Sequence, residues 1–216
     1  MANRYIDISI AISDAIPVWP GDPGVQVKPS SRIDQGDQAN VSRLEFGTHT
    51  GTHLDPPYHF LPKGKKEDQL SFGPMMGHCW VADLTSIQGN ITGADLEGAG
   101  IPNGTTRLLL KTRNSRHWAN ETPDSGFDEG FCGLTPDASQ WIVNRGIQLV
   151  GIDYLSVEPY KGDDDTHRIL LRAGVIPVET LDLHAVEPGS YTLVCLPIKI
   201  KDGDGGPCRA ILISED

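Results

Sequence analysis

The chain has 216 residues, enough for one domain with a substantial hydrophobic core. Its 29 acidic and 18 basic residues give a net charge of −11, which argues against nucleic acid or an anionic membrane as a partner. No apolar run reaches the roughly 18–20 residues of a membrane span, and residues 1–10 lack the apolar stretch of a signal peptide. The cysteines show no paired spacing, so we expect free thiols and a cytoplasmic protein.

Alternating apolar and polar residues predict a first strand around Ile6, Ile8 and Ile10. Residues 18–23 form a turn-rich loop whose Trp19 lies either in a pocket wall or on the surface. Similar patterns predict later strands at residues 41–46, 78–84, 107–112, 148–153, 175–178, 191–200 and 209–214.

Three short helices are predicted between these strands. Thr92 and Asp95 are typical of a helix start. Thr135-Pro136-Asp137 begins a second helix that ends at Gly146. The third covers residues 168–173 and follows an acidic run, residues 163–165, that is either solvated or caps the helix.

Strands outnumber helices, and neither a linker nor a repeat is visible. We therefore predict one α/β domain over residues 1–216, built on a mixed sheet or partial barrel with short flanking helices. The polar segment 114–131 is interpreted as a lid or a partner-facing loop.

Residues 49–59 place three histidines and an aspartate within a short stretch, His-Thr-Gly-Thr-His-Leu-Asp-Pro-Pro-Tyr-His. In an extended segment, His49, Gly51, His53 and Asp55 fall on one face, where their ligand groups converge. A helix would also bring His49 and His53 together, but it would carry Asp55 away, and Pro56 disfavours helical backbone at Asp55.

A single histidine is more often exposed or part of a core than a metal ligand. Here two imidazoles, a carboxylate and an intervening glycine occur together, and this combination favours a metal site of the kind that zinc prefers. The glycine-rich loop 202–207 lacks the context of a phosphate-binding loop. None of the cysteines lies near a basic or histidine-rich motif, so a cysteine nucleophile is disfavoured.

The segment from His49 to Phe60 resembles the signature of the cyclase-type metal hydrolases, which include bacterial kynurenine formamidase and the isatin hydrolases. The resemblance extends to residues 151–157, to His167 followed by Glu179, and to residues 206–210. It implies a swivelling β/β/α fold and a homodimer or homotetramer.

The resemblance also implies the role of each site residue. His49, His53 and Asp55 would hold one metal ion, and Asp55 would bridge to a second held by His167 and Glu179. Two zinc ions are expected, with manganese as the alternative. His59 would be a catalytic histidine that is not a ligand, serving as general base or acid. Without the resemblance, His167 and Glu179 would be ordinary polar residues at a helix start and a strand end.

These roles predict hydrolysis of a small amide by metal-activated hydroxide. The best single substrate is N-formylkynurenine, which would give kynurenine and formate. The alternatives are a cyclic amide such as isatin, another small amide, or a non-catalytic metal-binding protein. An aromatic substrate wall could include Trp19, Phe46 and Phe72, although each fits a core position equally well. Asp153 is either an orienting partner of an imidazole or a turn residue.

Overall fold

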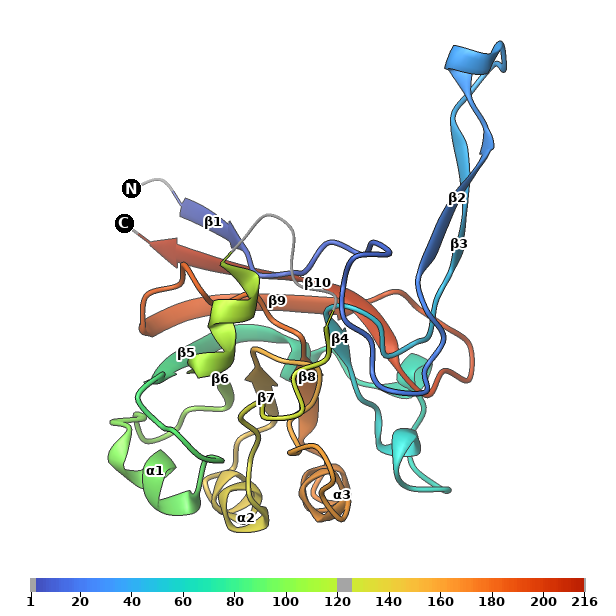
Figure 1. The fold of residues 1–216 in the computed structure, drawn as a ribbon. Coiled ribbons are helices and arrows are strands. Elements are labelled where there is room, and N and C mark those ends of the chain that lie inside the picture. The colour runs from blue at the N-terminus through green and yellow to red at the C-terminus, as the bar shows by residue number, and fades with distance from the viewer. Residues whose placement is uncertain (1–2, 120–125, 216) are drawn as a thin grey trace.

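A computed structural model describes residues 3–119 and 126–215 (Figure 1). The strands are β1 (Asn3–Asp7), β2 (Gln26–Ser31), β3 (Val41–Glu45), β4 (His53–Leu54), β5 (Met76–Leu84), β6 (Arg107–Thr112), β7 (Leu149–Ile152), β8 (Ile176–Glu179), β9 (Gly189–Pro197) and β10 (Gly206–Glu215). The α-helices are α1 (Gly93–Gly98), α2 (Pro136–Asn144) and α3 (Asp165–Arg172). Short 3-10 helices are η1 (Ile33–Gln35), η2 (Pro57–His59), η3 (Glu67–Gln69), η4 (Gly73–Met75) and η5 (Arg113–Trp118).

The main sheet closes on itself. Its strand order is β1-β10-β4-β8-β7-β6-β5-β9, and β9 also pairs with β10, so the strands from β4 to β10 form a ring. Neighbours from β5 to β8 are parallel, whereas the other pairs are antiparallel. The expected single α/β domain with a mixed sheet is thereby confirmed, and the partial barrel is a closed one. Within the described residues, no helix is long and apolar enough to cross a membrane.

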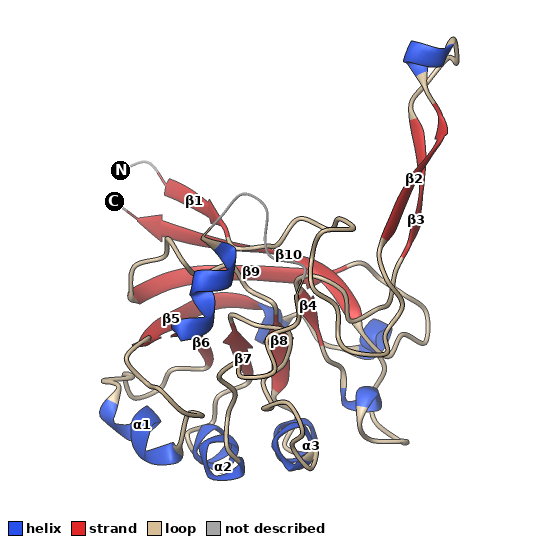
Figure 2. Cartoon of the chain, in the orientation of Figure 1, coloured by secondary structure: helices blue, strands red, loops and turns tan. Residues whose placement is uncertain are grey.

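Side chains alternate between the inside of the barrel and the helix-covered side. Leu108 and Leu110 of β6 belong to the cluster beneath the helices, whereas Leu109 belongs to the cluster inside the ring. This alternation is the period-2 geometry of a strand covered on both faces. The three α-helices lie together along one side of the sheet (Figure 2).

The predicted helix starts are confirmed. Thr92 caps α1 by accepting from the Asp95 N–H, and Asp95 accepts from the Thr92 N–H in return. Pro136 occupies the first turn of α2, as the sequence predicts. α3 begins earlier than predicted, at Asp165, so His167 lies inside the helix rather than before it.

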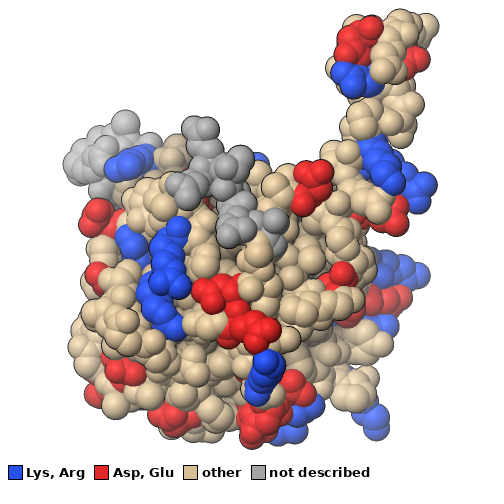
Figure 3. Space-filling view, viewed as in Figure 1, with Lys and Arg blue, Asp and Glu red and all other residues tan. Residues whose placement is uncertain are grey.

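β2 and β3 form a separate two-stranded ribbon, here called the arm, that projects from the body (Figures 1 and 3). The strand predicted at residues 41–46 is therefore present, but it does not join the main sheet. Its apolar residues Val41 and Leu44 are 51% and 59% exposed. The prediction of a rigid strand feeding the histidine segment is wrong in this respect, because β3 is anchored only to β2.

Candidate metal centre

The centre of the site is β4, which lies between β10 and β8. His53 is paired with Glu179 of β8 on one side and with Pro207 of β10 on the other. The Asp55 N–H continues the ladder by donating to the Pro177 carbonyl at 3.1 Å. Strand pairing alone therefore fixes the backbones that carry His53 and Glu179 next to each other, and Asp55 follows directly.

His49 reaches the site through a turn, not along an extended strand. Gly51 has φ +62°, in the left-handed region that favours glycine. The prediction of one extended face from His49 to Asp55 is therefore wrong at its first half and right for His53 and Asp55. The glycine-rich loop 202–207 packs closely against His49. A Cβ at Gly205 would lie 2.7 Å from the His49 ring, so the glycine leaves room for this imidazole.

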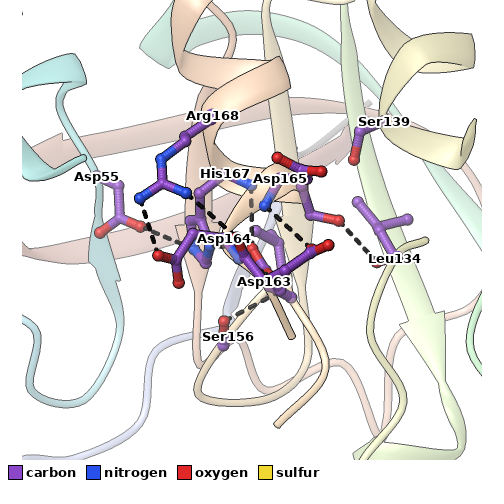
Figure 4. Close-up of polar contacts among 12 residues, drawn as sticks. Asp55, Leu134, Ser139, Ser156, Asp163, Asp164, Asp165, His167 and Arg168 are labelled. Carbon is purple, nitrogen blue, oxygen red and sulfur yellow. Dashed lines mark hydrogen bonds and ion pairs between the residues drawn. The ribbon is translucent and has the colours of Figure 1, made fainter. Parts of the chain in front are cut away.

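α3 supplies His167 from the helix-covered side. The Nε2 atom of His167 lies 3.2 Å from Glu179 Oε1 and 3.6 Å from Asp55 Oδ2. Figure 4 shows the His167 side chain directed toward Asp55, with the turn of residues 163–165 beside it. Asp55 and His167, more than one hundred positions apart in sequence, are thus close enough to bind the same metal ion.

The remaining distances complete the cluster. His53 Nε2 lies 3.3 Å from Glu179 Oε2 and 3.6 Å from Asp55 Oδ1, and His49 Nδ1 lies 2.9 Å from Asp55 Oδ1. All five residues predicted as ligands therefore meet around Asp55. His59, at the end of η2, has a ligand atom within 4.8 Å of those of His49 and Asp55. Its separate role as a non-ligand stays a prediction, because its position alone does not set it apart.

Two buried atoms in this cluster lack a hydrogen-bond partner, namely Asp55 Oδ2 and His49 Nε2. Buried polar atoms are normally paired, so an orphaned carboxylate oxygen beside an orphaned imidazole nitrogen is unusual. Imidazole and carboxylate are also the ligand types that zinc and related divalent ions prefer. The residues present therefore fit a divalent metal centre.

The electrostatics of the cluster are those of charged groups held close together. Burial disfavours the charge of Asp55, but His59 and His49 hold its pKa far below the usual range. Burial also opposes a charge on His167, yet its contacts with Glu158 and Glu179 raise its pKa to about 10. Desolvation by packed atoms lowers the pKa of His59, although the residue as a whole is exposed. A neutral His59 can accept a proton.

A cavity of about 380 Å³ opens onto the cluster. Its apolar wall contains Trp19, Phe60 and Leu155. Trp19 is thus where the sequence predicted it. Phe46 and Phe72 are not among the described residues that line this cavity, so both predictions are corrected. Phe72 precedes η4 and is 67% exposed, while Phe46 follows β3 at the base of the arm.

Phe60 and Leu155 were missed because nothing local marks them. Phe60 stacks on His167 with ring centroids 4.4 Å apart, a contact between residues distant in sequence. The signal that could have found Phe60 is its position directly after His59. Leu155 lies within the segment 151–157, already noted for its resemblance to the family.

The segment 114–131 contributes to the wall behind Trp19. Phe127 packs edge-on against Trp19 at 5.2 Å and against Tyr160 at 4.9 Å. Residues 120–125 lie outside the described part of the chain, so the choice between a lid and an interface stays a prediction. The aromatic packing shows that the rest of the segment is attached to the cavity wall.

Other candidate groups lie outside the cluster. The Asp153 carboxylate accepts from Thr112 and Ser115, so it ties β6 to β7 and does not orient an imidazole. The remaining histidines have partners of their own outside the cluster: His78 with Ser190, His117 with Asp128, and His184 with Asp182. All four cysteines are free, namely Cys79, Cys132, Cys195 and Cys208. Burial raises the pKa of Cys79 to about 12, which opposes a role as nucleophile.

Comparisons with known proteins place the chain in a family. The model of the Cyclase family, "Putative cyclase", matches residues 6–159. Cyclase-like protein 3 of Arabidopsis thaliana is 36% identical over 219 residues, covering 98% of this chain and 80% of that protein. Kynurenine formamidase of Salinibacter ruber is 35% identical over 211 residues, covering 96% of each.

Solved structures show the same architecture. A structure described as a potential metal-dependent hydrolase with cyclase activity aligns over the whole of both chains, with 30% identity and a TM-score of 0.84. An isatin hydrolase bound to the product analogue thioisatinate has a TM-score of 0.85, covering 99% of this chain and 93% of that one. At 18% identity, this second likeness concerns the fold alone. Family model, relatives and fold agree, and the chain belongs to the Cyclase family.

Proposed function

We propose that this protein is a metal-dependent hydrolase of small amides, with an arylformamide such as N-formylkynurenine as the best single substrate. The observation that carries the proposal is the meeting of His49, His53, Asp55, His167 and Glu179 around an unpaired carboxylate oxygen. Relatives named kynurenine formamidase, 32% and 35% identical over nearly the whole chain, support the substrate class.

The five residues would hold two divalent ions, with zinc expected and manganese the alternative. Bound there, such ions supply acidified water near neutral pH and Lewis acidity toward a carbonyl oxygen. The chain's own contribution to proton transfer is His59, which accepts a proton at a ring nitrogen from the attacking water. The same nitrogen returns it to the leaving amine. The lowered pKa keeps His59 neutral and ready to accept.

The cavity sets the shape of the substrate. Its volume, about 380 Å³, lies in the range of small-molecule sites. Trp19 and Phe60 present flat apolar surfaces on which an aryl ring can pack, leaving the amide directed at the cluster. Trp19 is itself held by Phe127 and Tyr160, so this wall is fixed before the substrate arrives.

The experiment is a substrate screen with zinc- and manganese-loaded protein. N-formylkynurenine, formanilide and isatin are each tested for hydrolysis, with a chelator-treated sample as control. Turnover of the formamides that is lost with chelator and restored by metal supports the proposal. Turnover of isatin alone would make a cyclic amide the substrate in place of a formamide. Metal binding without any turnover would reject the formamidase assignment.

Metal binding is expected to strengthen as pH rises. His167 keeps its proton up to a pKa of about 10, and it must lose that proton to act as a ligand. Its contribution to the stability of the metal-free protein is fully present below its ordinary pKa of 6.5 and is lost as pH rises through about 10. The rise in Tm caused by zinc should therefore grow between about pH 6 and pH 8. Calorimetry in buffers of different ionisation enthalpy should show proton release, and identical heats in all buffers would contradict the expectation.

We further propose that the protein is a homo-oligomer in which the arm packs on a second copy. A two-stranded ribbon without further cover is marginally stable in water. Val27 and Leu44 are paired across the ribbon and are 46% and 59% exposed, so one face of the arm presents apolar surface. A two-fold axis would let each arm cover the other subunit at once.

Leu44→Lys is expected to shift the protein to a 23.4 kDa monomer, because it places a charge within the apolar face. Light scattering after size exclusion measures the mass. Arg43→Ala is the matched control, since adjacent strand residues face opposite sides and its partner is Lys28. A wild-type protein that is monomeric at micromolar concentration would reject this role of the arm.

A further inference from the structure

Glu158 is a buried carboxylate beside the metal centre, and no sequence motif singles it out. It is 6% exposed, and it lies one residue beyond the segment 151–157. Its Oε2 atom is 2.9 Å from His167 Nδ1 and accepts from the His167 backbone N–H at 3.2 Å. Its Oε1 atom accepts from the Asp164 N–H at 2.6 Å. The carboxylate therefore faces His167 from the side opposite to Asp55 and Glu179.

These contacts determine which nitrogen of His167 carries a proton. Both carboxylate oxygens already accept backbone N–H groups, and an ionised carboxylate can only accept. Nδ1 of His167 must then be the donor in its contact with Glu158. In the neutral ring the lone pair is left on Nε2, the atom that lies 3.2 Å from Glu179 and 3.6 Å from Asp55. A histidine that donates from one nitrogen to a carboxylate is the arrangement that orients metal ligands.

Glu158 also fixes the start of α3. The N-cap residue Asp164 makes no side-chain cap bond, and its own carboxylate is paired with Arg168 instead. The acceptor at this helix end is Glu158, which bonds to the backbone of His167 three residues after the cap. A negative group at this position is favourable to the helix. Within the acidic run 163–165, shown beside His167 in Figure 4, Asp163 accepts from the Asp165 N–H at 3.5 Å, so Glu158 and Asp163 share the end of the helix.

The loop between Glu158 and α3 is shaped around the carboxylate. A Cβ at Gly162 would lie 2.3 Å from Glu158 Oε1, so any larger residue there would displace the carboxylate. Lys161 and Asp164 on either side have φ of 63° and 62°, a left-handed conformation that costs free energy in residues other than glycine. The backbone accepts this strain while enclosing a single acidic side chain.

We propose that Glu158 is a positioning residue that sets the tautomer and orientation of His167 and thereby the affinity of the second metal position. This inference rests on the proposed metal-dependent function. Glu158 acts through His167, since its carboxylate is occupied by the backbone of Asp164 and by His167. The first position, held by His49 and His53, does not depend on it.

Glu158→Gln tests the assignment, with zinc binding measured against chelator-buffered free metal. The variant is expected to bind the first ion as wild type does and the second about 10–100-fold more weakly. In nitrogen-15 NMR spectra of the zinc-loaded variant, the signal of the hydrogen-bonded Nδ1 proton of His167 should be absent. Asp163→Asn, which removes an exposed charge from the same loop, is the matched control and should change neither. Glu158→Asp should restore part of the lost affinity.

The outcomes separate this inference from the function on which it rests. A wild-type protein that binds no metal rejects the function itself. A wild type with two ions and a Glu158→Gln variant with unchanged affinity for both rejects the role of Glu158. If Glu158→Gln does not fold, Gly162→Ala decides, because it displaces the carboxylate while keeping its charge. Gly162→Ala should weaken the second ion, and an unchanged affinity would overturn the proposal.

Discussion

Replacing His59 with alanine is expected to lower kcat about 10²–10⁴-fold while leaving the metal content close to that of the wild type. This range is the usual loss when a positioned general acid or base is removed. His59 lies at the end of η2, outside the strand pairs that fix His53 and Glu179. Its ring stacks on His49 with centroids 3.8 Å apart, but His49 is also held by Asp55 at 2.9 Å, and this contact does not involve His59.

The measurement is steady-state kinetics together with metal analysis of the same preparation. His78→Ala is the control, since His78 is paired with Ser190 away from the cluster. A His59→Ala protein without metal would place His59 among the ligands, which its proximity to His49 and Asp55 also permits. A protein with full metal and full activity would remove His59 from the mechanism.

Asp55→Asn is expected to lose both metal ions and all measurable activity. Asp55 Oδ1 faces His49 and His53, while Oδ2 faces His167, so one carboxylate serves both halves of the centre. An amide has a single oxygen acceptor and no charge, and it cannot replace a bridging carboxylate. Metal analysis and activity should fall together.

Asp153→Asn is the matched control for this variant. Asp153 is equally buried, but its hydrogen bonds go to Thr112 and Ser115. Its replacement should lower the Tm without removing metal, because unpaired buried groups cost stability. An Asp55→Asn protein that retains one ion at wild-type affinity would show that Asp55 does not bridge.

The elements that follow from local chemistry could be predicted from the sequence. β6 was expected at residues 107–112 and has those bounds, because Leu108, Leu109 and Leu110 form a run buried on both faces. Thr92 with Asp95 marks α1 for an equally local reason, a reciprocal cap. The arm was not foreseen. Val27 was in no predicted strand, and the alternation around Leu44 predicted a strand but not its pairing, which in the structure is with β2 alone, leaving both residues exposed.

The site residues also fall into those that local sequence predicts and those that it does not. His53 and Asp55 could be placed from strand alternation, because His53 lies in β4 and the Asp55 N–H continues the ladder to Pro177. His49 could not be placed correctly, since the left-handed Gly51 turns the chain before it. His167 and Glu179 were found only through a resemblance. Glu158 and Phe60 were missed because both act on His167, whose position depends on how α3 packs against the sheet.

The most direct test of the central claim is elemental analysis of wild-type and His53→Ala protein purified without chelator. The two-ion assignment predicts close to two divalent ions per chain in the wild type and the loss of at least the first ion in the variant, because His53 belongs to the first position and faces both Asp55 and Glu179. A wild-type protein that contains no divalent ion, and takes up neither zinc nor manganese when they are added, would contradict it.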